Sequence, residues 1–237
     1  EMYNGILSGV SLDGEKYNYT NPLGSVGDHH RVPWFDCACC PPNVARFLPA
    51  VPGLVYACAA GGVYVNQYMS GRGKVTVGDD EMVFVQKTDY PWDGRVGIRL
   101  ELRRPAYLEL NFRVPGWCGG VRIRVNGVGV ESAARERGYV KIRRKWSNGD
   151  SVVLDLPMPV RRVYADPNVE ADRGRVAIAR GPLVYCLEGV DNGGRVRNLC
   201  LPRGSELSAE RRPGLLGGVT VVKGRALEAD FLAVPYY

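Results

Sequence analysis

Three of the chain's seven cysteines lie within four residues, at Cys37, Cys39 and Cys40. A cysteine acts as a nucleophile or as a metal ligand only in its thiolate form. The proline pair Pro41-Pro42 follows directly, and proline is well tolerated in the first turn of a helix. A helix N-terminus carries partial positive charge on its unpaired backbone N–H groups. We therefore expect Cys39 and Cys40 to lie just before the positive end of a helix, where a thiolate is stabilised.

The residues after the proline pair predict that this helix is short. Val44, Phe47 and Leu48 form an apolar stripe with helical spacing. Pro49 and Pro52 are expected to end the helix soon afterwards, because proline lacks the backbone N–H that an interior position needs.

Three interpretations of the cysteine cluster follow from the residues alone. The thiols could be buried and inert, because free cysteine is among the most often buried residue types. They could hold a structural zinc ion, although such sites usually show a second cysteine pair downstream. The third interpretation is a reactive cysteine beside a zinc ion, in which one thiolate is both ligand and nucleophile. The other cysteines stand singly: Cys58, Cys118, Cys186 and Cys200.

The run PWFDCACCPPNVARFL at residues 33–48 resembles the signature of glycoside hydrolase family 127, the β-L-arabinofuranosidases and their relatives. The resemblance continues in the same order along nearly the whole chain. The further matching stretches are YNGILSG at 3–9, YTNPL at 19–23, YVN at 64–66, RVPGW at 113–117, VNG at 125–127 and ARGPLVY at 179–185.

This resemblance implies a retaining glycosidase with a zinc-bound cysteine, in place of the usual carboxylate, as the nucleophile. The nucleophile is then Cys39, which attacks the anomeric carbon of an arabinofuranoside-type substrate and forms a thioglycosyl intermediate. Cys39 and Cys40 are implied as ligands of a Zn²⁺ ion, whereas Cys37 is not assigned to the metal. The family's other two zinc ligands and its acid/base glutamate are expected upstream of these residues.

Two further residues are candidates for contacts with the sugar, again by resemblance. Glu1 is similar to a family glutamate near the sugar pocket, and Tyr19 could contribute a hydroxyl to the substrate. The pair His29-His30 invites assignment as zinc ligands, but the family completes its metal shell with glutamate and cysteine. We therefore expect the two histidines to be exposed to solvent.

The family's architecture implies three parts for this chain. Residues 1–58 would be the last helices and loops of an (α/α)6 catalytic barrel, 59–160 a β-sandwich, and 161–237 a second, truncated β-rich domain. The first residues look like the middle of a helix, so we expect a C-terminal portion of a longer enzyme that is inactive by itself.

After residue 56 the apolar residues alternate, so the chain is predicted to be mainly β, with antiparallel β-sandwich domains after the helical remnant. Asn126-Gly127 and Asn148-Gly149 are strong turn signals. Strands are predicted at 63–68, 74–77, 82–85, 96–102, 107–112, 121–125, 139–142, 151–156, 176–179, 183–188, 199–202, 219–226 and 231–234, with loops at 189–197 and 203–218.

Composition limits the possible partners. The net charge of +6 comes mainly from arginines that alternate with apolar residues, as in 121–125, and no nucleic-acid-binding motif accompanies them. We therefore expect no specific nucleic-acid partner, and without an apolar run of about 20 residues we expect no membrane span. A clustered, odd-numbered set of cysteines argues against a disulfide scaffold and favours the cytoplasm.

A rival interpretation from a different class stays open at this stage. The chain could be a non-catalytic β-sandwich protein that binds carbohydrate or another partner. It would then use the cysteines only for a structural zinc-thiolate site.

Overall fold

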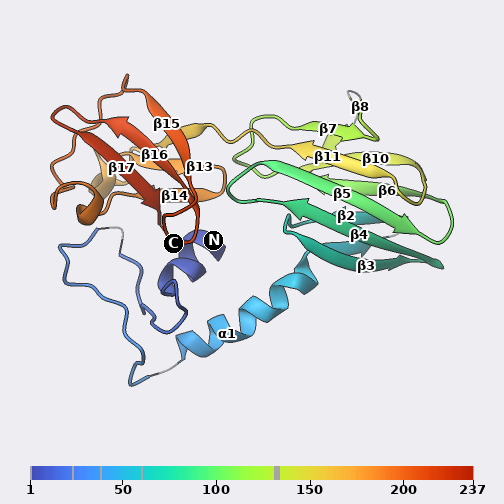
Figure 1. Cartoon of the computed structure of the whole chain (residues 1–237), viewed down its shortest axis with the longest axis horizontal. Coiled ribbons are helices and arrows are strands. Elements are labelled where there is room, and N and C mark those ends of the chain that lie inside the picture. Colours follow the sequence, from blue (N-terminus) through green and yellow to red (C-terminus); the bar gives the residue numbers. More distant parts are fainter. Residues whose placement is uncertain (1, 23, 38, 60, 131–133, 237) are drawn as a thin grey trace. The chain divides into compact units, whose positions relative to one another are not determined.

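The computed structural model describes residues 2–22, 24–37, 39–59, 61–130 and 134–236. The described chain is mainly β, as the alternating pattern predicted, with its strands in three sheets (Figure 1). It divides into two compact units: residues 47–158 form one, and residues 1–46 together with 159–237 form the other. None of the described helices is long and apolar enough to span a bilayer.

The unit at 47–158 contains two sheets, with strand orders β1-β2-β6-β10-β9 and β3-β4-β5-β11-β7-β8. Its described strand pairs are antiparallel except that β2 runs parallel to β6. The strands are β1 Tyr56–Ala59, β2 Gly62–Val65, β3 Gly71–Val77, β4 Asp80–Thr88, β5 Arg95–Leu102, β6 Ala106–Arg113, β7 Arg122–Val125, β8 Val128–Gly129, β9 Ala134–Glu136, β10 Tyr139–Trp146 and β11 Ser151–Asp155.

The two sheets of this unit enclose one hydrophobic core. In β5, Val96, Ile98 and Leu100 point inward and are buried, while the residues between them face outward. Residues of both sheets belong to the same buried cluster, so the two sheets pack face to face as a sandwich. Its largest fully buried side chains are Trp146, Phe84 and Phe112.

The two turn signals of the sequence lie where the chain reverses. Asn126 and Gly127, between β7 and β8, have φ of 52° and 83°, which is the backbone that a two-residue hairpin turn requires. Gly149, between β10 and β11, has φ of 86°. Both predictions of a turn are confirmed.

The C-terminal sheet of the other unit has the strand order β12-β13-β14-β17-β16-β15, and its pairs are antiparallel. Its core consists of residues such as Leu183, Val221 and Ala233, which are fully buried. The strands are β12 Val160–Val163, β13 Ala177–Arg180, β14 Leu183–Cys186, β15 Leu207–Arg212, β16 Val219–Arg225 and β17 Asp230–Pro235.

Two sequence predictions for this sheet are wrong. The stretch 199–202, predicted as a strand, is irregular. Pro202 has no N–H for a ladder, and the backbone here makes single bonds, such as Leu227 N–H to Cys200 O at 3.0 Å, in place of a continuous ladder. The stretch 203–218, predicted as a loop, contains β15. β15 is an edge strand whose full register with β16 supplies its hydrogen bonds.

The N-terminal segment contains little regular structure. Met2–Ile6 form a π-helical turn, Val10 and Val32 each form an isolated bridge with Tyr17, and the one described α-helix is α1, Cys40–Ala50. α1 is short and ends at Ala50, between Pro49 and Pro52, as predicted, with Pro49 inside its last turn. The (α/α)6 barrel therefore stays a prediction. Short 3₁₀ turns occur at Leu7–Gly9, Val51–Leu54, Glu170–Asp172 and Gly189–Asp191.

Candidate active site

The cysteine cluster lies at the start of α1, as the sequence predicted. Cys40 is the first residue of the helix, and Cys39 directly precedes it. Pro41 and Pro42 occupy the first turn, where their missing N–H groups leave no hydrogen bond unmade. The two thiols are therefore next to the positive end of the helix dipole.

The sulfur atoms of the two adjacent cysteines are close together and reachable from solvent. Cys39 Sγ and Cys40 Sγ lie 3.6 Å apart. Cys37, Cys39 and Cys40 are all exposed, so this chain by itself does not bury the thiols, contrary to the interpretation of a buried, inert cluster. The sulfurs are free to react or to bind a metal ion.

Tyr19 meets the cysteines from a stretch of chain far from α1 in the sequence. Its hydroxyl lies 3.0 Å from Cys39 Sγ and also within hydrogen-bonding distance of the backbone carbonyl oxygen of Cys37. The Tyr19 ring packs edge-on against Phe35, with ring centroids 4.5 Å apart. The structure thus brings a predicted substrate residue to the sulfur of the predicted nucleophile.

The hydrogen bonds make the two thiols unequal acids. The bond from the Tyr19 hydroxyl, followed by the one with Cys40, lowers the pKa of the Cys39 thiol. The bond with Cys39 raises the pKa of the Cys40 thiol. The same contact with Cys39 raises the pKa of Tyr19, so Tyr19 stays protonated as a donor. Cys39 is therefore the first of the pair to become a thiolate.

We expect Tyr19→Phe to move the alkylation of Cys39 to higher pH. Without the hydroxyl, the Cys39 thiolate loses the donor that lowers its pKa, so a smaller fraction of Cys39 is ionised near neutral pH. The rate of iodoacetamide labelling, followed at Cys39 by peptide mass mapping across a pH series in chelator, measures this change.

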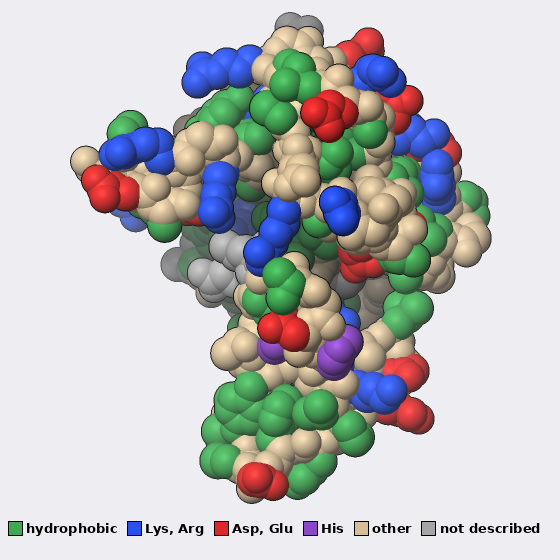
Figure 2. Space-filling model, turned by 90° about the vertical axis from the view of Figure 1, so that its left-hand side faces the viewer, with side chains coloured by type: hydrophobic (Ala, Val, Ile, Leu, Met, Phe, Trp, Pro, Cys, Tyr) green, Lys and Arg blue, Asp and Glu red, His purple; other side chains and the backbone are tan. Residues whose placement is uncertain are grey.

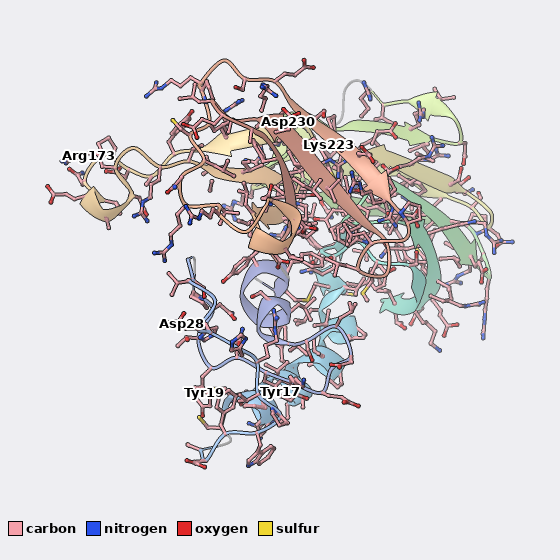
Figure 3. The ribbon with its side chains drawn as sticks, turned by 60° about the vertical axis from the view of Figure 1, so that its left-hand side comes forward. Tyr17, Tyr19, Asp28, Arg173, Lys223 and Asp230 are labelled. Carbon is pink, nitrogen blue, oxygen red and sulfur yellow. The ribbon has the colours of Figure 1, made fainter. Side chains whose placement is uncertain are left out.

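The matched control is Tyr17→Phe. The Tyr17 hydroxyl donates to the carbonyl oxygen of Gly14 at 2.8 Å, and Tyr17 lies on the same stretch of chain as Tyr19 (Figure 3). This variant should keep the wild-type pH profile. If Tyr19→Phe also keeps it, the hydroxyl does not act on the thiol.

The remaining predicted site residues lie elsewhere or outside the described chain. Glu1 lies outside the described residues. His30 is exposed as expected, whereas His29 is half-buried, with its ring nitrogen 3.0 Å from the carbonyl oxygen of Thr20. Asn43, which the sequence did not predict as a site residue, donates to the carbonyl of Cys39 at 3.0 Å and accepts a bond from Arg46. It steadies the start of α1 behind the thiols.

The thiol pair fits two positions of a zinc site. Two thiolates on one tetrahedral zinc ion, each at about 2.3 Å, lie about 3.8 Å apart, close to the 3.6 Å between Cys39 Sγ and Cys40 Sγ. Across the described residues, no group of three or more His, Cys, Asp or Glu side chains could hold a metal ion. The described residues therefore offer two ligands and no complete shell.

The N-terminal segment exposes several large apolar side chains. Leu12, Val26 and Trp34 expose 79%, 70% and 66% of their surface, and no residue of α1 is buried. Figure 2 shows hydrophobic side chains gathered on the surface near the two histidines. Exposed apolar surface of this kind typically contacts another protein segment.

Comparison with known proteins gives one consistent family. Three models of glycoside hydrolase family 127 match the chain: the β-L-arabinofuranosidase catalytic domain over residues 1–53, the middle domain over 62–158 and the C-terminal domain over 160–237. The chain is 35% identical to the non-reducing end β-L-arabinofuranosidase of Bifidobacterium longum subsp. longum, over 94% of this chain.

Solved structures give the same result. A GH127 β-L-arabinofuranosidase from Geobacillus stearothermophilus T6 matches all of this chain with a TM-score of 0.92 and 38% identity. Another GH127 β-arabinofuranosidase matches with a TM-score of 0.95 and 36% identity. The chain spans 36% of the Bifidobacterium protein and 42% of each of these two structures.

Proposed function

Because the chain belongs to glycoside hydrolase family 127, we propose that it is the C-terminal portion of a retaining β-L-arabinofuranosidase whose nucleophile is Cys39. One observation carries the proposal: Cys39 Sγ is exposed beside a helix N-terminus, 3.0 Å from the Tyr19 hydroxyl and 3.6 Å from Cys40 Sγ. This arrangement favours one thiolate over the other. The name of the Bifidobacterium relative supports an arabinofuranoside as the substrate.

The chemistry that this chain contributes is a nucleophilic displacement. The Cys39 thiolate attacks the anomeric carbon, so a C–S bond forms while the glycosidic C–O bond breaks. The leaving oxygen takes its proton from a general acid that lies outside this chain. Water then attacks the anomeric carbon and gives its proton to the group that acted as the acid, so a C–O bond forms while the C–S bond breaks. This restores the Cys39 thiolate and releases the sugar with its original anomeric configuration.

Cys39 and Cys40 would hold a zinc ion, which keeps both sulfurs deprotonated near neutral pH when it is bound. In this proposal Cys40 is a zinc ligand only, whereas Cys39 is both a zinc ligand and the nucleophile. Two ligands do not complete a tetrahedral shell, so the remaining zinc ligands come from outside this chain. For the same reason the chain alone should be inactive.

The apolar surface of the N-terminal segment supports the proposal that the rest of the site lies outside this chain. The apolar stripe of α1 includes Val44 and Leu48, yet none of its residues is buried. A helix with an apolar stripe normally packs against neighbours. We propose that the rest of an (α/α)6 catalytic barrel covers this stripe and brings the acid/base glutamate to Cys39.

A chimera tests the proposal. The part of the Bifidobacterium longum relative that precedes the region matched by this chain would be joined to residues 1–237. The chimera is expected to hydrolyse an aryl β-L-arabinofuranoside, while the chain alone and the chimera with an aryl α-L-arabinofuranoside show no turnover. Zinc content and cooperative unfolding report whether the chimera is folded.

Two results would contradict the proposal. A folded, zinc-loaded chimera without activity would leave Cys39 with no catalytic role. Stoichiometric zinc in the chain alone, retained against a mild chelator, would support the rival interpretation of a binding module with a structural zinc-thiolate site.

A further inference from the structure

The side chain of Asn4 continues a backbone ladder of the C-terminal sheet. Its amide nitrogen donates to the carbonyl oxygen of Pro182 at 2.8 Å, and its amide oxygen accepts the backbone N–H of Val184 at 2.8 Å. β17 pairs with β14 up to this point, where the backbone N–H of Tyr236 donates to the carbonyl of Val184 at 2.9 Å. The Asn4 amide therefore bonds to β14 at the position that β17 would occupy if it continued.

Tyr236 makes a second link from this sheet to the N-terminal segment. Its hydroxyl donates to the carbonyl oxygen of Pro22 at 2.9 Å, in a half-buried position. Asn21, next to Pro22, donates from its side chain to the carbonyl of Gly5 at 2.7 Å. The stretch around Asn4 and the stretch around Pro22 are thus tied to the sheet and to each other.

These links lie close to Tyr19. Tyr19 precedes Pro22 by three residues, and on its other side Tyr17 exchanges two backbone hydrogen bonds with Val32, each 2.9 Å long. The short stretch between Tyr17 and Pro22 is held at both ends. Its Tyr19 hydroxyl is the group that contacts Cys39 Sγ, and Figure 3 shows Tyr17 and Tyr19 together on this stretch.

We propose that Asn4 and Tyr236 are positioning residues: they hold the stretch at residues 17–22 so that the Tyr19 hydroxyl stays against the sulfur of Cys39. The C-terminal sheet then acts on the nucleophile through Tyr19. The inference rests on the proposed role of Cys39, but the contact it concerns is within this chain and can be observed without glycosidase activity.

The side chains suit this role better than a general role in stability. The Tyr236 hydroxyl can be removed as Tyr236→Phe, which deletes one hydrogen bond and keeps the ring. Asn4→Ala removes both bonds of the amide. A loss of one such anchor leaves the ladder of β14, β16 and β17 intact, because those pairs are formed by backbone groups.

Fluorine NMR of the chain labelled with fluorotyrosine tests the proposal. The resonance of Tyr19 is identified by its absence in Tyr19→Phe, and Cys39→Ala shows how far it moves when the contact with sulfur is lost. We expect Tyr236→Phe to produce most of that displacement, and Asn4→Ala to displace the same resonance in the same direction. Tyr164→Phe is the control, because Tyr164 is exposed in the same unit and stacks with Arg203.

The resonance of Tyr185, which is buried in β14 and donates from its hydroxyl to the carbonyl of Thr220 at 2.9 Å, reports that the C-terminal sheet of the variants is folded. The proposal is overturned if the Tyr19 resonance keeps its wild-type position in both Tyr236→Phe and Asn4→Ala. It is also overturned if Cys39→Ala leaves that resonance unmoved, because there is then no contact to position. Neither result depends on whether Cys39 attacks a sugar, so a failure here differs from a failure of the chimera.

Discussion

Cys39→Ser should abolish turnover in the chimera, with a loss of more than about a thousandfold, because removing one member of a catalytic unit removes most of its effect. The serine hydroxyl is far less acidic than a thiol and is a poor zinc ligand, so it supplies neither a nucleophile nor the metal position. The protein should remain folded, since Cys39 is exposed and buries no apolar surface. Hydrolysis of an aryl β-L-arabinofuranoside measures the loss.

The same experiment separates the roles of the two sulfurs. Cys40→Ser should act through the metal, lowering zinc content together with rate, and excess zinc should restore part of the activity. Cys200→Ser is the control, because Cys200 is exposed and lies far from the cluster in the sequence. A mechanism-based arabinofuranosyl inhibitor should label Cys39. A label on Cys40 or Cys37, with Cys39 unmodified, would show that another sulfur is the nucleophile.

The alternating strands of the sandwich could be predicted because burial on one face imposes a period of two. β5 is the clearest case: Val96, Ile98 and Leu100 are buried and Arg95 and Arg99 are exposed. The alternation of apolar and polar residues is enough to recognise such a strand in a short window of the sequence. Nearly every predicted strand of residues 59–160 is found within a few residues of its expected place.

β15 could not be predicted by the same rule, because its side chains carry no burial pattern. Its residues Leu207–Arg212 are mostly exposed, and three of the six are charged. What makes it a strand is the backbone ladder with β16 and the ion pairs of Glu210 with Arg212 and Lys223. An edge strand of this kind is specified by its neighbour. The stretch 199–202 is the opposite case: its apolar residues predicted a strand, but no strand pairs with it and it is irregular.

The candidate site also has features that local sequence rules predict and features that they do not. The cysteines, the proline pair and the helix start lie within a few consecutive residues, so their arrangement follows from local rules. Tyr19 was found only through the family resemblance. Asn4 lies in a stretch that matches the family, but the positioning contacts of Asn4 and Tyr236 could not be predicted. Their partners Pro182 and Pro22 are well over a hundred residues away in the chain, and hydrogen bonds from side chains to a distant backbone leave no pattern in the sequence.

The largest expected effect on stability is at Trp146, which is fully buried in the sandwich core and donates from its ring N–H to the carbonyl of Leu108 at 3.2 Å. Trp146→Ala should lower the free energy of unfolding of the unit at 47–158 by about 3–5 kcal/mol, because it leaves a large cavity in a close-packed core. Hydrogen exchange in increasing urea, read in peptides from β6, measures this loss.

The unit that contains the C-terminal sheet has its own core, with Leu183, Val221 and Ala233 fully buried. Peptides from β16 should therefore keep their wild-type protection in Trp146→Ala, since the cavity lies in the other unit. Trp34→Ala is the matched control, because Trp34 is 66% exposed and surface substitutions usually change stability by less than about 0.5 kcal/mol. A loss of under about 1 kcal/mol at β6, against the 2–5 kcal/mol typical of core truncation, would contradict the sandwich core. Equal losses at β6 and β16 would show that the two units unfold as one.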